Sequence, residues 1–349
     1  MPCNAPLWRR SLNSKGGIQI IILHVVPVQL AALVLIHTVA LAQPLAPSRP
    51  SAKDAPDGVV TGTDVYEFTY AATLPDIPGE AHLWVPMAKS DLFQEVKASV
   101  KSMPTVRMME IRDVVYRNKV LYGVLDSTAS GKRMEIQYTV TRREKPTYLI
   151  EGENTDIYLG AQKLVPVNKR FREIAQSVTS NSGSAAHAAL ALYEHVLETM
   201  QYDNSGEGWG CGDAIRACDV KTGNCTDFHS NLIALCRSIG IPARFELGFT
   251  IPHDRDSGAI AGYHCWAEMH VGARWVPVDV SEASKHKELV PYYFGTHPAN
   301  RLEISIGRDL ILNPAPTSGR PNFLVYPLLE IDGKPVDVKT EFTFKRIKN

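Results

Sequence analysis

The sequence has no excess of charge of either sign, and it lacks the short motifs by which several protein classes are recognised. Its 349 residues include 37 lysine and arginine side chains against 37 aspartate and glutamate side chains. A balanced chain offers no electrostatic basis for binding nucleic acid or an anionic membrane surface. It carries no nucleotide-binding or flavin motif. We therefore expect neither a nucleic-acid partner nor a cofactor.

Cysteine is scarce, and its spacing does not match the common zinc motifs. No C-x-x-C pair occurs, so we expect no metal site. Cys3 lies in a leader described below, and the other five cysteines are Cys211, Cys218, Cys225, Cys236 and Cys265. In an exported chain an odd number leaves at least one thiol unpaired, unless it pairs between chains. We expect a local disulfide between Cys211 and Cys218, and the remaining connectivity stays open.

The first 42 residues have the layout of a secretion signal. Arg9, Arg10 and Lys15 form a basic start, residues 18–36 form an apolar run, and small residues end at Ala42. We predict cleavage after Ala42 and a periplasmic or secreted protein. The alternative is an uncleaved membrane anchor, because the apolar run approaches the length that spans a bilayer.

The rest of the chain divides by composition and periodicity. Residues 43–60 are rich in proline, alanine and serine and indicate a disordered linker. Residues 61–145 contain short segments of alternating polarity, which predict a β-sandwich domain. Over residues 146–312 helical periodicity comes first and antiparallel strands follow, which is typical of an α+β domain. Residues 313–349 predict a C-terminal β-hairpin extension, closed at an Asp-Gly turn.

Cys225 stands where a helix is expected to begin. Gly223 and Asn224 favour a turn, and apolar residues then recur at helical spacing up to Ile239. A helix N-terminus stabilises a thiolate and supplies N–H groups that can stabilise an oxyanion. The sulfur of Cys225 is therefore a candidate nucleophile. The alternative is a small buried apolar side chain.

Two histidines compete as the partner of Cys225. His229 lies four residues further along the same helix, where packing or a local hydrogen bond is its expected role. His264 begins one predicted strand and Asp279 ends the next, with a tight turn at residues 272–273 between them. Antiparallel pairing across that turn brings the two side chains together. Asp279 can then orient the His264 ring, which in turn can activate Cys225.

Three stretches of the sequence resemble the bacterial transglutaminase-like domain, a relative of the papain-type cysteine enzymes. They read GNCTDFHSNLIALCRSIGIPAR, GYHCWAEMHVGARWVPVDVSEASK and YDNSGEGWGCGDA. The resemblance covers about residues 145–310. It implies an α+β core of helices packed on an antiparallel sheet, and a β-sandwich before it. It also implies Cys225 as the nucleophile, His264 as general base and acid, and Asp279 as the residue that orients His264.

The same resemblance implies the chemistry. Active members attack a carboxamide or peptide carbonyl and form a thioester. The Cys225 backbone N–H is the expected oxyanion donor, and Tyr202 and Trp209 are candidates for a second one. The expected protein is an exported thiol amide hydrolase or acyltransferase that acts on peptides or proteins. Fold alone does not choose between these reactions. Two alternatives remain: a catalytically silent module that binds a peptide or cell-wall component, and a structural protein held by disulfides or zinc.

Overall fold

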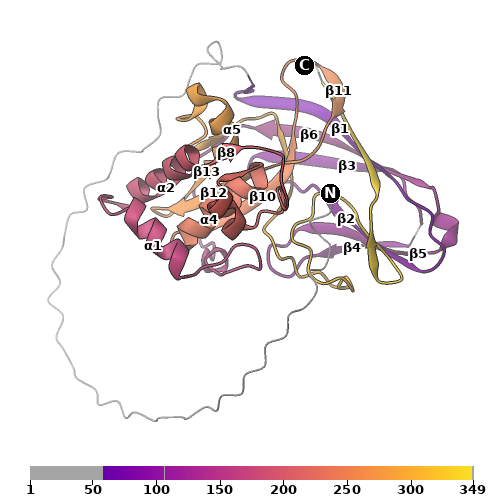
Figure 1. Cartoon of the computed structure of the whole chain (residues 1–349). Coiled ribbons are helices and arrows are strands. Elements are labelled where there is room, and N and C mark those ends of the chain that lie inside the picture. The colour runs from indigo at the N-terminus through magenta and orange to yellow at the C-terminus, as the bar shows by residue number, and fades with distance from the viewer. Residues whose placement is uncertain (1–57, 106, 348–349) are drawn as a thin grey trace, which may run out of the picture. The chain divides into compact units, whose positions relative to one another are not determined.

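The structure is a computed structural model that describes residues 58–105 and 107–347, all of which lie in one compact unit (Figure 1). The predicted secretion signal and all but the last three residues of the predicted linker lie outside the described residues. In the described part, none of the helices has the length and apolarity needed to span a bilayer.

The strand-rich part of the chain forms two five-stranded sheets. The order of the first sheet is β11-β18-β1-β6-β3, and that of the second is β17-β16-β2-β5-β4. The strands of the first sheet are β11 (Ser257–Ile260), β18 (Lys339–Arg346), β1 (Thr63–Thr73), β6 (Arg133–Arg143) and β3 (Gln94–Ser102). Those of the second are β17 (Lys334–Val336), β16 (Leu328–Ile331), β2 (Ala81–Met87), β5 (Lys119–Leu125) and β4 (Met108–Arg112).

Alternation along the strands explains how the two sheets pack. Tyr66, Phe68 and Tyr70 of β1 are fully buried, as are Leu83 and Val85 of β2. Side chains of successive strand residues point to opposite faces, so these alternate residues line one inner face on each sheet. Strands from residues 328–346 join both sheets, so the predicted C-terminal extension supplies strands to the sandwich.

The second part of the unit is an antiparallel sheet covered by helices, which confirms the predicted α+β class. The order of this central sheet is β13-β12-β10-β15. Its strands are β13 (Arg274–Val278), β12 (His264–Val271), β10 (Ala243–Thr250) and β15 (Arg301–Ile306). Two-residue strands add short pairings: β7 (Lys145–Pro146) with β14 (Thr296–His297), and β8 (Gln201–Tyr202) with β9 (Thr222–Gly223).

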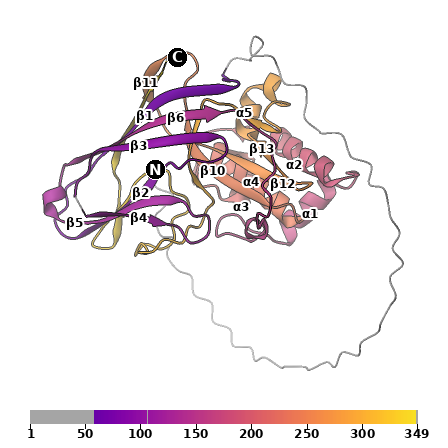
Figure 2. The same cartoon turned by 180° about the vertical axis from the view of Figure 1, so that it is seen from behind.

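The described residues form five α-helices, and four of them lie around the fifth, the fully buried helix α4. Their bounds are α1 (Lys169–Val178), α2 (Ala185–Thr199), α3 (Ala214–Val220), α4 (Cys225–Ser238) and α5 (Val280–Lys285). Every residue of α4 is buried, and α4 packs on β12 with α1, α2 and α3 around it. Figures 1 and 2 show these helices gathered beside the central sheet, away from the sandwich strands. Helix α4 is therefore the buried centre of this part.

Helices α1 and α2 each begin at a polar side chain that caps the helix N-terminus. Asn168 accepts a hydrogen bond from the Phe171 N–H at 3.1 Å, and Ser184 accepts one from the His187 N–H at 3.2 Å. Each side chain satisfies an amide that has no partner inside its own helix. Both helices therefore begin at a capping side chain.

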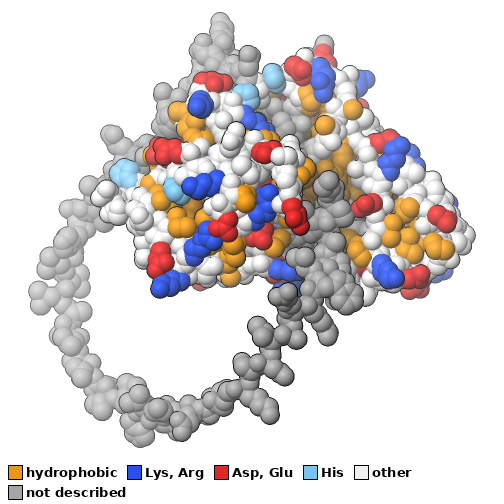
Figure 3. Space-filling model, in the orientation of Figure 1, with side chains coloured by type: hydrophobic (Ala, Val, Ile, Leu, Met, Phe, Trp, Pro, Cys, Tyr) orange, Lys and Arg blue, Asp and Glu red, His pale blue; other side chains and the backbone are white. Residues whose placement is uncertain are grey.

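The expected disulfide between Cys211 and Cys218 is wrong. Cys218 is a free thiol in α3, and its sulfur lies 3.6 Å from the guanidinium of Arg170. The helix turns this side chain toward α1 rather than back along the chain. On the face shown in Figure 3, acidic and basic side chains of the described residues are interspersed, in keeping with the balanced composition.

Candidate active site

Cys225 is the first residue of α4, and its position is fixed by a capping box. The Asn224 side chain accepts from the Thr226 N–H at 2.9 Å, and the Asp227 side chain accepts from the Asn224 N–H at 3.0 Å. These reciprocal bonds hold the first turn of the helix in place. The Cys225 sulfur therefore sits at the positive end of the helix dipole.

A glycine-rich loop is attached to the same helix start. The buried Asp227 carboxylate accepts hydrogen bonds from the N–H groups of Gly210 at 2.7 Å and Gly212 at 3.0 Å. Gly212 has φ +65, and an added Cβ would lie 2.6 Å from the Thr226 side chain. Only glycine allows the loop to come this close to α4 in that backbone conformation.

A tight hairpin brings the second and third predicted site residues together. Gly272 and Ala273 both have positive φ, as a two-residue turn of this kind requires, and β12 pairs with β13 on either side of it. The His264 Nε2 then lies 2.7 Å from Asp279 Oδ2. Asp279 also caps α5, since its Oδ1 accepts from the Glu282 N–H at 2.9 Å. The carboxylate is thus held from two sides.

A buried arginine completes the surroundings of Asp279. Arg301 Nη2 donates to the same Oδ2 that His264 contacts, at 2.5 Å. Burial alone would raise the pKa of Asp279, but the charges of His264 and Arg301 hold that pKa well below its usual value. Asp279 is therefore a carboxylate throughout the neutral range.

The electrostatics favour an ion pair between Cys225 and His264. Burial would lower the pKa of His264, but the Asp279 charge and hydrogen bonds to Asp279 and Cys225 raise it to about 10. Hydrogen bonding to Cys265 and to His264 lowers the pKa of Cys225 well below its usual value, although burial opposes this. Because Nε2 of His264 is bound to Asp279, Nδ1 is the ring nitrogen left for Cys225. The arrangement suits a thiolate beside an imidazolium.

The two oxyanion candidates lie in different surroundings. The parallel pairing of β8 with β9 sets Tyr202 beside Gly223, two residues before Cys225. Burial and the charge of Cys225 raise the pKa of Tyr202 to about 12. Trp209 lies half-buried in the glycine-rich loop, and among the described residues no hydrogen bond or ring contact joins it to Cys225 or His264. Of the two, Tyr202 is the one whose pKa is affected by the charge of Cys225.

The structure places further side chains around the site, and of these only His229 had a role expected from the sequence. Tyr263, just before His264, lies with its hydroxyl 2.6 Å from Thr226 Oγ1. His229 donates from Nδ1 to the Cys225 carbonyl at 2.8 Å, which is the local bond expected for it, and its Nε2 lies 3.6 Å from Asp279. Strand alternation does not indicate Cys265, because it directly follows His264, yet its sulfur lies near Thr226 and His229 of α4. Nothing local in the sequence indicates Arg301.

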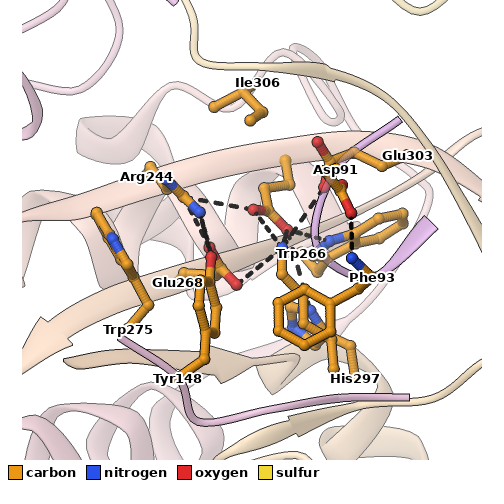
Figure 4. A network of polar contacts seen from close by, with 12 residues as sticks. Asp91, Phe93, Tyr148, Arg244, Trp266, Glu268, Trp275, His297, Glu303 and Ile306 are labelled. Atoms are coloured by element: carbon orange, nitrogen blue, oxygen red, sulfur yellow. Dashed lines mark hydrogen bonds and ion pairs between the residues drawn. The ribbon is translucent and has the colours of Figure 1, made fainter. Parts of the chain in front are cut away.

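The central sheet also carries a buried charge network, shown in Figure 4. Lys145 Nζ lies 3.0 Å from Glu246 Oε1, 2.9 Å from Glu268 Oε1 and 3.6 Å from Glu303 Oε2. Trp266 donates from Nε1 to Glu246 at 2.6 Å. Arg301 stacks on the Trp266 ring at 4.7 Å, which connects this network to Asp279.

One group in the network has the composition of a metal site. Single ligand atoms of Glu246, Glu268 and His297 lie within 4.8 Å of one another. The Lys145 ammonium, however, lies within 3.0 Å of both carboxylates and supplies the positive charge there. We therefore assign no metal to it. A cavity of about 230 Å³ opens beside Lys145, lined by Phe93, Tyr148 and Glu303 among others, and Cys225 is not part of its lining.

Comparison with known proteins agrees with the fold described above. Residues 172–280 match the family model of the transglutaminase-like superfamily. An uncharacterised protein of Haemophilus influenzae is 24% identical over 326 residues, covering 79% of this chain and 88% of that one. A crystal structure from Cytophaga hutchinsonii, named as a candidate cysteine protease, superposes with a TM-score of 0.58 at 15% identity, covering 83% and 92% of the two chains. The chain therefore contains a transglutaminase-like domain, and it shares its fold with that structure.

Proposed function

We propose that this protein, whose residues 172–280 form a transglutaminase-like domain, is an exported thiol enzyme that hydrolyses or transfers amide bonds. Cys225 is the nucleophile, His264 the general base and acid, and Asp279 the residue that orients His264. The observation that carries the proposal is the 2.7 Å bond from His264 to Asp279, together with the interaction of the His264 side chain with Cys225. Peptides or proteins are the proposed substrates.

The proposed reaction has two halves. The Cys225 thiolate attacks the amide carbonyl, and the oxyanion is stabilised by the Cys225 N–H and the Tyr202 hydroxyl. The His264 imidazolium donates its Nδ1 proton to the departing amine, which leaves a thioester on Cys225. His264 then takes a proton from water or from an acceptor amine, which attacks the thioester and releases the thiolate. We favour hydrolysis, because water is the abundant acceptor outside the cell.

The first experiment measures the reactivity of Cys225. Iodoacetamide is added to the reduced protein near neutral pH, and the alkylated cysteines are mapped by mass spectrometry. We expect selective labelling of Cys225 that is lost in His264→Ala. A matched control is His270→Ala on the same strand, because His270 packs against Trp275 and makes no contact with Asp279. Cys225 reacting no faster than Cys218 would contradict the proposal.

The second experiment separates the reaction types. The purified protein is incubated with peptides and with glutamine-containing acyl donors, with and without an added primary amine, and Cys225→Ala serves as the control. Amide cleavage without amine indicates hydrolysis, and incorporation of the amine indicates transfer. A protein that binds peptide, turns over none and has an inert Cys225 is the silent binding module. Turnover that persists in Cys225→Ala would exclude the thioester route.

A further inference from the structure

A second thiol lies against the proposed nucleophile. Cys265 is the second residue of β12, the strand that packs on α4, and its side chain interacts electrostatically with that of Cys225. The Cys265 sulfur lies 3.7 Å from Thr226 Oγ1 and 3.8 Å from His229 Nδ1. These partners belong to the first two turns of α4, so Cys265 is held over the start of that helix. The strand and the helix therefore present two thiols to each other.

The two sulfurs differ in their charge state. Burial raises the pKa of Cys265 well above its usual value, so it is a neutral thiol. The Cys225 sulfur is the thiolate of the pair, stabilised by Cys265 and His264. Cys225 retains 3% of its surface exposed whereas Cys265 retains none. An oxidant that enters the site therefore meets the more nucleophilic sulfur first.

We propose that Cys225 and Cys265 form a reversible disulfide when a hydroperoxide oxidises the site, with Cys265 as the resolving thiol. This inference goes beyond the proposed function but rests on it in one respect, namely that Cys225 is a reactive thiolate. The disulfide removes the nucleophile from catalysis and protects it from irreversible oxidation. A dithiol reductant restores it.

The chemistry proceeds in two steps. The Cys225 thiolate takes one oxygen from hydrogen peroxide; the O–O bond breaks, water leaves, and a sulfenate forms on Cys225. His264 can protonate the sulfenate. Cys265 then loses its proton and attacks the Cys225 sulfur; the S–O bond breaks and a second water leaves with that proton. The two electrons consumed by the peroxide come from the two thiols. Reduction of the disulfide by a dithiol reverses the change.

The other free thiols in the described part of the chain have different neighbours. Cys236 lies near the end of α4, and its sulfur contacts Met269 Sδ at 3.3 Å. Cys218 lies in α3 beside Arg170. Cys236 is fully buried, lies on the same helix as Cys225 and contacts β12, the strand that carries Cys265. It therefore serves as the matched control cysteine.

The experiment uses the reduced full-length protein treated with hydrogen peroxide and digested with trypsin without reduction. Cys225 lies in the tryptic peptide 222–237, together with Cys236, and Cys265 lies in the peptide 256–274. We expect these two peptides to be linked after oxidation and separate again after dithiothreitol. The link should persist in Cys236→Ser, which removes the ambiguity within the first peptide, and should be lost in Cys265→Ser.

Trapping the intermediate completes the test. In Cys265→Ser and Cys265→Ala, verified as folded by near-ultraviolet circular dichroism, we expect dimedone to label Cys225 and prolonged peroxide to convert it irreversibly to sulfinic acid. Wild-type protein that forms sulfinic acid as fast as these variants, or that links through Cys236, overturns the inference. Selective alkylation of reduced Cys225 without any linked peptide refutes the disulfide alone, whereas failure of alkylation refutes the proposed function.

Discussion

The ring of His264 donates from Nε2 to Oδ2 of Asp279 at 2.7 Å, in a pair that is buried between β12 and the start of α5. The carboxylate fixes the tautomer of the ring, so that Nδ1 is the nitrogen available to Cys225. Its charge also favours the imidazolium form, which in turn favours a thiolate. Geometry and protonation at the site are therefore both set by Asp279.

Replacing Asp279 by asparagine should separate charge from shape. The variant keeps the size of the side chain but removes the charge that raises the pKa of His264, so that pKa should fall and the pKa of Cys225 should rise. From about pH 6 to 8, alkylation of wild-type Cys225 should depend less on pH than that of an ordinary thiol, because the pKa of Cys225 is held well below its usual value. In Asp279→Asn the rate should rise with pH over the same interval. Amide turnover should fall on the order of 10²–10⁴-fold.

Glu282→Gln is the control for this prediction. Its carboxylate lies 3.9 Å from His264 Nε2 and is bound to Lys285 at 2.8 Å, so it makes no hydrogen bond to the ring. We expect a pH profile close to that of the wild type. An unchanged alkylation profile in Asp279→Asn would show that Asp279 does not set the protonation of the site.

Arg301→Met should test how Asp279 is kept charged. Methionine preserves apolar packing on Trp266 but leaves the buried carboxylate without its arginine. Breaking a buried ion pair destabilises a fold by about 3–5 kcal/mol, which urea unfolding can measure. The folded pKa of Asp279 is depressed, so its contribution is present above the unfolded pKa of about 3.9 and is lost in acid. The loss of stability in the variant should therefore stay constant down to about pH 4 and shrink only below it.

A surface arginine provides the comparison. Arg133 pairs with Glu341 at 2.7 Å, but both side chains are more than two-fifths exposed. Arg133→Met should change stability by less than about 1 kcal/mol. Similar losses in the two variants would mean that burial of Asp279 and Arg301 does not determine the strength of their interaction.

The residues of the candidate site could be placed from the sequence because each depends on a local signal. A turn followed by helical periodicity places Cys225, and a two-residue turn at 272–273 places His264 near Asp279. Arg301 has no such signal. It comes from β15, which pairs with β10 rather than with a neighbour in sequence, and only the order of the strands brings it to Asp279.

The fold shows the same division between local and distant signals. The hairpin of β16 and β17 forms around Asp332, which has positive φ as the Asp-Gly turn predicts. The place of the C-terminal strand β18 in the sandwich was not predictable, because pairing such as Phe68 with Phe344 is decided by shared burial across most of the chain. Strand β11 comes from the α+β part of the sequence but pairs with β18 in the first sheet of the sandwich. No periodic pattern in the sequence predicts this pairing.

Two glutamates of the buried network should respond differently to neutral substitution. Burial and the charge of Glu268 raise the pKa of Glu246 to about 8. Arg244 and Lys145 hold the pKa of Glu268 well below its usual value, although burial opposes this. Glutamine mimics a protonated carboxyl, so Glu246→Gln should lower the free energy of unfolding only slightly at pH 7. Glu268→Gln should lower it by about 3–5 kcal/mol, because this substitution leaves buried cations unpaired. Urea unfolding of both variants measures the difference.

The pH dependence gives a second check on this pair. A folded pKa raised above the unfolded value contributes stability that is present below the unfolded pKa and is lost as pH rises through the folded pKa. The Glu246 contribution should therefore decline between about pH 4.5 and 8, and Glu246→Gln should lack that decline. The stability of Glu246→Gln relative to wild type should rise over this interval. Equal losses in Glu246→Gln and Glu268→Gln at pH 7 would contradict the assignment of the proton to Glu246.

Alanine substitution of two glycines in the loop at residues 206–212 should distinguish the effect of backbone strain from the effect of close approach to α4. Gly206 and Gly212 both have positive φ, so alanine at either position is strained by roughly 1 kcal/mol. At Gly206 the new Cβ would meet only an Arg216 atom at 3.6 Å. At Gly212 it would lie 2.5 Å from Ser230 Oγ and 2.6 Å from Thr226 Cγ2, which forces the loop away from the helix that carries Cys225.

Gly212→Ala should therefore lose about 1–3 kcal/mol more than Gly206→Ala in urea unfolding, because overpacking adds to the backbone strain. The Gly212 N–H bond to Asp227 should also weaken, and with it the capping box that positions Cys225. We expect slower alkylation of Cys225 in Gly212→Ala and a near-normal rate in Gly206→Ala. Equal stability and equal alkylation rates in the two variants would show that the loop does not support the start of α4.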